Sequence, residues 1–257
     1  MLDKYQKSNL QCGATLIHQQ RRQPPLTVIK FFFPAGSSFD PPGKQGLAVL
    51  TGELLTTSSK KMDMYQFGRF TEKHGLKVSS SVSRDYTVIS FTAINDNLPA
   101  LYKIIDQVFN QPVFSGKAFE RTKTRQLAEI RSRREQTSSF ALDEGAQFFY
   151  GDHPYGSPLR GHLETVAELK PVDCRKFFEE NITLSGLIIS TVGEADTGKI
   201  TTIAENLDLN SEPANRPQKN NFSPNRGRKI FHKQIEQPTH LLFYPAPALT
   251  AAEYIPL

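Results

Sequence analysis

The chain has 257 residues, a formal net charge of +5, 38% hydrophobic residues and 22% charged residues. These proportions are typical of a globular chain and exclude a disordered one. The positive charge is too small to indicate nucleic-acid binding by itself. No apolar run approaches the roughly 18–20 residues of a membrane span. Eighteen Phe and no Trp predict a core rich in phenylalanine.

The first half of the chain alternates strand pairs with helix pairs. In chain order, the sequence predicts strands at 14–20 and 26–35, helices at 46–55 and 62–74, strands at 76–83 and 86–93, and a helix at 98–109. Gly75 follows the second helix, in the usual position after a helix end. The helix at 98–109 has its apolar residues at the helical period and Pro99 near its first turn.

The second half is expected to be mainly helical before a late strand. In chain order, we expect helices at 115–135 and 138–151, a loop rich in Gly and Pro at 151–161, two short helices within 164–182 and a buried strand within 184–196. Residues 210–229 have the composition of a linker, and a strand is expected again at 239–247.

Together these elements predict an α+β fold, in which helices cover one side of a mostly antiparallel sheet. No G-x-G-x-x-G or G-K-[ST] loop is present, which excludes a doubly wound nucleotide binder. We divide the chain into a first α/β domain at 1–209, a linker at 210–229 and the start of a truncated second, homologous domain at 230–257. This division predicts that the chain is a fragment.

The two cysteines, Cys12 and Cys174, lie far apart and outside any C-x-x-C motif. This spacing excludes a zinc ribbon and a thioredoxin motif. One disulfide or two buried thiols remain open, and we expect the thiols. Residues 1–11 lack the apolar segment of a signal peptide. The compartment stays undetermined: periplasmic for a bacterial protein whose signal has been removed, and cytoplasmic otherwise.

Five segments in register resemble the pitrilysin/insulinase family, which includes the mitochondrial processing peptidases. Residues 31–55, "FFFPAGSSFDPPGKQGLAVLTGELL", resemble the segment that carries the inverted zinc motif H-x-x-E-H. The other four segments are similar in order and spacing: the strand pair, the helix pair that leads to a distal glutamate, the H-P-Y-G loop with its following helices, and the start of a second half. They are residues 76–93, 104–130, 153–183 and 239–257.

The zinc motif itself is absent from this sequence. The family places the motif just after G-L-A, which here puts Val49 at the first histidine, Gly52 at the catalytic glutamate and Glu53 at the second histidine. If Glu53 were instead the catalytic glutamate, the histidines would fall on leucines, at Leu50 and Leu54. The resemblance places the third ligand at Glu129. We therefore expect no catalytic residue and no confident metal ligand in this chain.

Catalytic zinc needs about three imidazole or carboxylate ligands and an open position for water. Val49 cannot ligate a metal, and Gly52 supplies no general base. Glu53 and Glu129 remain as residual candidates, which would hold a hard cation such as magnesium or calcium weakly. The alternative is that each glutamate is a half-exposed helix carboxylate paired with a nearby Lys or Arg, and we expect this one.

Other polar groups have both an ordinary and a functional interpretation. The helix at 115–135 presents either a solvated basic face or a wall for an acidic partner or substrate. His153 and His162 are either structural loop histidines or metal ligands, and no third ligand accompanies them. The basic residues of the helix are Lys117, Arg121, Lys123, Arg125, Arg131, Arg133 and Arg134.

The resemblance implies a non-catalytic subunit of a heterodimeric zinc metallopeptidase. Such a subunit shapes the chamber and helps to bind peptide, which the family holds as a strand added to a sheet edge. The expected partner is a homologous zinc-bearing subunit. We therefore expect zinc in the partner and no cofactor in this chain. Nucleic acid and a membrane span are not expected. Two alternatives remain: a structural core-type assembly subunit, and an active metallopeptidase with an atypical metal site.

Overall fold

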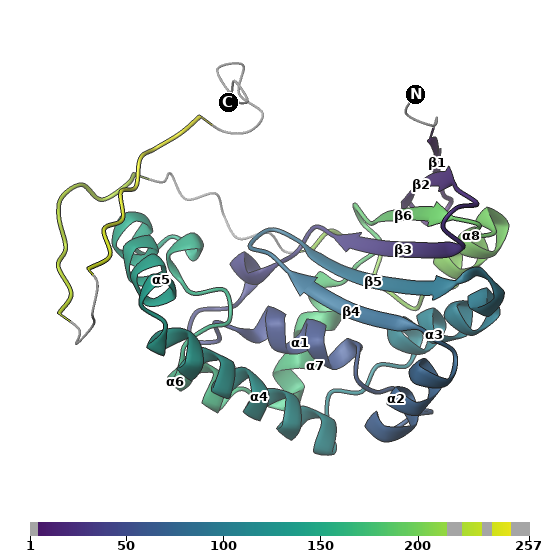
Figure 1. Ribbon diagram of the computed structural model, residues 1–257, viewed down its shortest axis with the longest axis horizontal. Helices are drawn as coiled ribbons and strands as arrows, with labels where there is room; N and C mark the ends of the chain where they lie inside the picture. The colour runs from purple at the N-terminus through teal and green to yellow at the C-terminus, as the bar shows by residue number, and fades with distance from the viewer. Residues whose placement is uncertain (1–4, 215–222, 233–237, 248–257) are drawn as a thin grey trace.

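The computed structural model describes residues 5–214, 223–232 and 238–247, and shows a sheet with helices packed below it (Figure 1). The strands are β1 (Gln6–Asn9), β2 (Thr15–Gln20), β3 (Leu26–Phe33), β4 (Lys77–Val82), β5 (Thr87–Ile94) and β6 (Ile188–Gly193). The α-helices are α1 (Leu47–Leu55), α2 (Met64–Lys73), α3 (Leu98–Asn110), α4 (Gly116–Glu135), α5 (Thr137–Tyr150), α6 (Leu163–Glu168), α7 (Pro171–Asn181) and α8 (Thr197–Glu205).

The six strands form one sheet in the order β1-β2-β6-β3-β5-β4. Neighbouring strands are antiparallel except β2 and β6, which run parallel with Leu16 opposite Ile189. The predicted α+β fold, with a mostly antiparallel sheet and helices on one side, is confirmed. β4 lies at one edge of the sheet, with α1 directly below it in Figure 1.

Alternation along the strands explains why one face of the sheet is covered. In β3, Ile29, Phe31 and Phe33 are fully buried, whereas the residues between them are partly or fully exposed. The buried side chains meet Phe109 of α3, whose ring centroid lies 4.8 Å from that of Phe31 and 5.6 Å from that of Phe33. Aromatic pairs at these distances stabilise a core beyond simple area burial. The predicted phenylalanine-rich core is therefore present between the sheet and the helices.

Three details differ from the sequence prediction. Strand β1 and helix α8 were not predicted. Residues 239–247, expected as a strand, are described without strand structure. A strand is stable only with a hydrogen-bonded neighbour, and no strand of the described sheet pairs with this segment. The expected second domain begins at residue 230, and residues 233–237 and 248–257 lie outside the described residues.

Both cysteines are free thiols, as expected. Cys174 is buried, whereas Cys12, which was also expected to be buried, is only partly so. None of the helices in the described part of the chain is long and apolar enough to cross a membrane.

Candidate functional site at the degenerate zinc motif

Helix α1 carries the degenerate motif, and a precise set of backbone contacts fixes its start. Gly46, the residue before the helix, has a φ of 97°, a conformation that favours glycine. A Cβ atom at Gly46 would lie only 2.4 Å from the carbonyl oxygen of Arg160. Gln126 of α4 donates from its Nε2 to the carbonyl oxygens of Gly46, at 3.0 Å, and Arg160, at 2.9 Å. The start of α1, the middle of α4 and the loop before α6 are therefore joined at one point.

Asp40 caps the same helix end. Its carboxylate accepts hydrogen bonds from the backbone N–H groups of Gly46, at 2.7 Å, and Ala48, at 2.8 Å. Burial raises the pKa of Asp40 to about 7, although the backbone donors at the helix start oppose this shift. The carboxyl group therefore titrates near neutral pH.

The two positions that lack metal chemistry are buried in the fold. Val49 is 5% exposed, and its side chain has no atom that ligates a metal. Gly52 faces the edge strand β4, where an added Cβ would lie 3.0 Å from Cγ2 of Val82 and 3.6 Å from Cβ of Ser80. The glycine thus allows α1 to approach β4 closely. Where the family has its general base, this chain has a tight contact between helix and strand.

Glu53 and Glu129 lie together, bridged by two arginines. The Oε1 atom of Glu53 accepts from Nη1 of Arg160 at 2.9 Å, and its Oε2 atom accepts from Nη2 of Arg125 at 2.9 Å. The same Nη1 of Arg160 lies 2.6 Å from Oε2 of Glu129, as an ion pair without hydrogen-bond alignment. Arg125 and Glu129 form a longer i,i+4 contact of 3.9 Å. We call these four residues the arginine–glutamate cluster.

The cluster is partly shielded from water. The exposed fractions of the side chains rise from 16% for Glu53 to 34% for Arg160, 39% for Glu129 and 52% for Arg125. Charge-assisted hydrogen bonds are stronger when they are sheltered in this way. The contacts join α1, α4 and the loop before α6. Both glutamates therefore have the expected arginine partners, but Glu53 is more buried than the expected half-exposed carboxylate.

The residues present do not fit a catalytic zinc ion. Val49 offers no ligand, Gly52 offers no base, and the oxygens of both glutamates already contact guanidinium groups. Within the described ranges, no group of three or more His, Cys, Asp or Glu side chains is placed to hold a metal. Whether the two carboxylates retain weak affinity for a cation stays a prediction.

The loop histidines have structural contacts. Nδ1 of His153 accepts from the backbone N–H of Tyr155 at 3.2 Å, and its ring packs 5.0 Å from the ring of that tyrosine. His162 precedes α6 as its N-cap residue. Neither histidine belongs to a group of potential metal ligands in the described part of the chain.

The basic residues of α4 fall into groups with different surroundings. Lys123 donates to the carbonyl oxygen of Leu169 at 2.9 Å. Arg133 binds Asp143 through two hydrogen bonds of 2.8 and 3.0 Å. Lys117 and Arg121 are exposed and line an open groove of about 1370 Å³ between α2, β4 and α4. The basic residues of α4 therefore include an ion pair with Asp143 near the C-terminal end of the helix and a groove wall near its N-terminal end.

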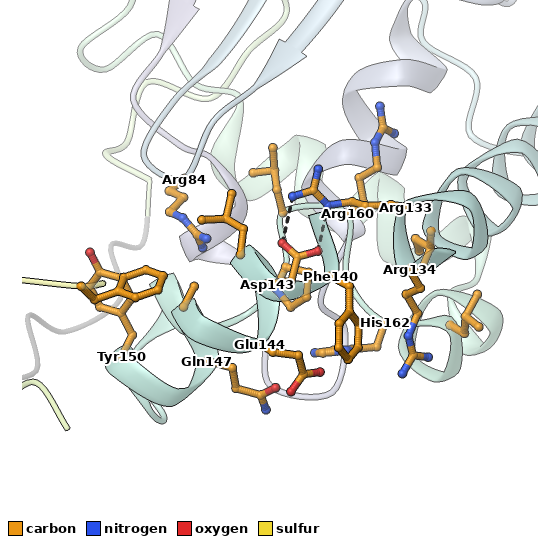
Figure 2. A pocket seen from close by; sticks show the side chains of 18 residues that line it. Arg84, Arg133, Arg134, Phe140, Asp143, Glu144, Gln147, Tyr150, Arg160 and His162 are labelled. Carbon is orange, nitrogen blue, oxygen red and sulfur yellow. Dashed lines mark hydrogen bonds and ion pairs between the residues drawn. The ribbon is translucent and has the colours of Figure 1, made fainter. Parts of the chain in front are cut away.

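A second, smaller pocket of about 350 Å³ lies between α4, α5 and the loop before α6 (Figure 2). Figure 2 shows the Asp143 carboxylate directed at the guanidinium of Arg133. Arg160 lines this pocket as well, whereas Val49, Gly52 and Glu53 do not. The pocket is therefore adjacent to the arginine–glutamate cluster, separate from the face of α1 that carries the motif.

Comparison with known proteins identifies the family. The family described as Insulinase (Peptidase family M16) matches residues 17–162. An "Uncharacterized zinc protease" of Rickettsia bellii is 20% identical over 94% of this chain and 59% of that protein. The "Non-peptidase homolog YmxG" of Helicobacter pylori is 20% identical over 92% of this chain and 55% of that protein. The beta subunit of the mitochondrial-processing peptidase of Neurospora crassa is 20% identical over 83% of this chain and 45% of that protein.

Solved structures give the same fold. A structure described as the peptidase M16 inactive domain from Pseudomonas fluorescens matches with a TM-score of 0.75 and 22% identity, over 82% of this chain and 52% of that one. The chain belongs to the insulinase family, peptidase family M16. It spans somewhat more than half the length of the Rickettsia bellii and Helicobacter pylori relatives, and it lacks the family's zinc motif.

Proposed function

We propose that this chain is the non-catalytic subunit of a two-subunit zinc metallopeptidase, and that it holds an extended peptide for a zinc-bearing homologue. The arginine–glutamate cluster carries this proposal. Nη1 of Arg160 contacts both carboxylates that could remain as metal ligands. A guanidinium is a permanent cation, so it competes with any metal ion at this point. This observation disfavours an active peptidase with an atypical metal site.

The edge strand β4 supports the peptide-binding part of the proposal. β4 is the last strand in the sheet order and pairs with β5 on one side. None of the described strands pairs with its other side. An unpaired edge offers backbone donors and acceptors to an added strand. The open groove between α2, β4 and α4 lies along this edge and gives room for the side chains of such a peptide.

A homologous partner is supported by a named subunit among the relatives, the beta subunit of the mitochondrial-processing peptidase. The test combines the chain with a homologue from the same genome that has an intact H-x-x-E-H motif. We expect the two to co-purify and peptide cleavage to require the mixture. Undiminished cleavage by the homologue alone would refute the proposal. Co-purification without any effect on cleavage would favour the structural core-type subunit instead.

Two neighbouring proline substitutions test the role of β4. On an edge strand, alternate residues direct their backbone N–H groups toward the partner strand and away from it. Of Ser79→Pro and Ser80→Pro, one therefore loses an N–H that pairs with β5, and the other loses an outward N–H. The variant that loses the outward N–H is expected to fold with nearly unchanged stability and to lose peptide binding. Unchanged peptide affinity in that folded variant would contradict edge-strand binding.

A further inference from the structure

The groove between α2, β4 and α4 carries a marked excess of positive charge. Five positive and two negative side chains line it: Arg69, Lys77, Lys117, Arg121 and Arg125 against Glu72 and Glu120. This imbalance is local, because the whole chain has a net charge of only +5. A cleft lined by one sign of charge concentrates ligands of the opposite sign.

Four of these cations are not neutralised within the fold. Arg125 is engaged with Glu53. The other four, which are Arg69, Lys77, Lys117 and Arg121, make no ion pair with the described residues. All four are exposed to solvent, so their charges are available to a ligand in the groove.

The arrangement on α4 carries an energetic cost that a negative ligand would relieve. Lys117 and Arg121 are four residues apart, so they lie on the same face of the helix. Like charges at this spacing destabilise a helix. A carboxylate placed between them would replace repulsion with two attractions.

The groove also has apolar surface beside these charges. Met64, Phe67, Leu76 and Val78 contribute to its lining. Tyr65 is 71% exposed, and the guanidinium of Arg69 lies over its ring, 5.8 Å from the ring centroid. An aromatic ring and a row of cations can together receive a peptide that contains both apolar and acidic side chains.

We propose that this groove selects acidic peptides in extended form, with their backbone on β4 and their Asp and Glu side chains directed at Lys117 and Arg121. The inference rests on the proposed function of β4 as a peptide-binding edge. Successive side chains of a strand point to opposite faces. The acidic residues that matter are therefore expected at every second position of the peptide.

The test compares three peptides of equal length and identical background with Glu, Gln or Lys at every second position. Their binding to the full chain is measured by fluorescence anisotropy at low and high salt. The Glu peptide is expected to bind about tenfold more tightly than the Gln peptide, and the Lys peptide more weakly. High salt is expected to reduce the difference, because it screens exposed charges.

A matched pair of variants separates the groove from net charge. Lys117→Glu/Arg121→Glu reverses two charges that line the groove. Arg131→Glu/Arg175→Glu makes the same change in net charge at exposed positions that line neither described pocket. The first variant is expected to lose the preference for the Glu peptide, and the second to keep it.

The outcomes separate the two proposals. Equal binding of the three peptides, or an equal loss of preference in both variants, would overturn the acidic selectivity and leave β4 as a general peptide-binding edge. Absence of binding for all three peptides would overturn both the acidic selectivity and the proposed function.

Discussion

Replacing Arg160 by methionine is expected to destabilise the protein by removing the centre of the arginine–glutamate cluster. Methionine keeps the length and the apolar stem of the side chain. The backbone of residue 160 is held independently by Gln126, which donates to its carbonyl oxygen at 2.9 Å. The substitution therefore removes the guanidinium and leaves the loop in place.

The structure sets the size of this effect. A hydrogen bond to a charged group contributes about 1.5–3 kcal/mol when sheltered, and an exposed ion pair about 0–1 kcal/mol. Glu53 is 16% exposed and Arg160 is 34% exposed, so their contact lies between these limits. Glu129 also loses a partner, whereas Arg125 continues to hold Glu53. We expect a loss of about 2 kcal/mol in the free energy of unfolding.

Urea denaturation measures this loss, with Lys176→Met as the matched control. Lys176 pairs with Glu180 at 3.7 Å, and both side chains are more than half exposed. Its removal is expected to change the free energy of unfolding by less than about 0.5 kcal/mol. A double-mutant cycle with Glu53→Gln is expected to give a coupling of about 1–2 kcal/mol. If Arg160→Met costs no more than Lys176→Met, the cluster is solvated and the reasoning is wrong.

Three further predictions concern metal affinity, pH dependence and thiol reactivity. Isothermal titration of the chain with zinc is expected to show no tight binding, and tight binding that is lost in Glu129→Ala would contradict this. The raised pKa of Asp40, about 7 in the fold, favours the protonated form. The contribution of Asp40 to stability is therefore expected to fall as the pH rises from about 4 to about 7, by up to about 1.4 kcal/mol per pH unit. Asp40→Asn should remove this slope, and an unchanged slope in urea titrations would refute the assignment. Burial raises the pKa of Cys174 to about 12, so iodoacetamide is expected to modify Cys12 alone in the native protein and both cysteines after unfolding. Modification of Cys174 in the native protein, detected by mass spectrometry, would show that this thiol is accessible and contradict the prediction.

The fold was predictable where side-chain alternation specifies which face is buried. β3 follows this rule, and a strand was expected there from the sequence, whereas its pairing with β5 was not. β1 could not be predicted from the sequence, because its residues, Gln6–Asn9, are all polar and exposed and show no apolar alternation. Pairing with β2 gives it its conformation. Residues 239–247 show the opposite case, since this apolar and aromatic run has no neighbouring strand among the described residues and is not a strand.

The candidate site was predictable only in part. The positions of Val49, Gly52 and Glu53 followed from the resemblance of one segment, and the i,i+4 spacing of Arg125 and Glu129 is visible in the sequence. Arg160 could not be found in this way, because it lies 107 residues from Glu53 in a loop without regular structure. Its position depends on the tertiary contact of Gln126 with two carbonyl oxygens, which no local pattern indicates.

The cluster also explains how a chain of this family can lack zinc chemistry and keep the same scaffold. A metal ion ligated from α1 and α4 would join the two helices by its charge. Here Arg160 contacts Glu53 of α1 and Glu129 of α4 through one nitrogen atom, so a guanidinium makes the same connection. The helices then stay in place below β4, and the edge and groove stay open. The proposed peptide binding is thus physically separable from catalysis in this fold, because catalysis needs metal ligands on α1 and the proposed binding uses the backbone of β4.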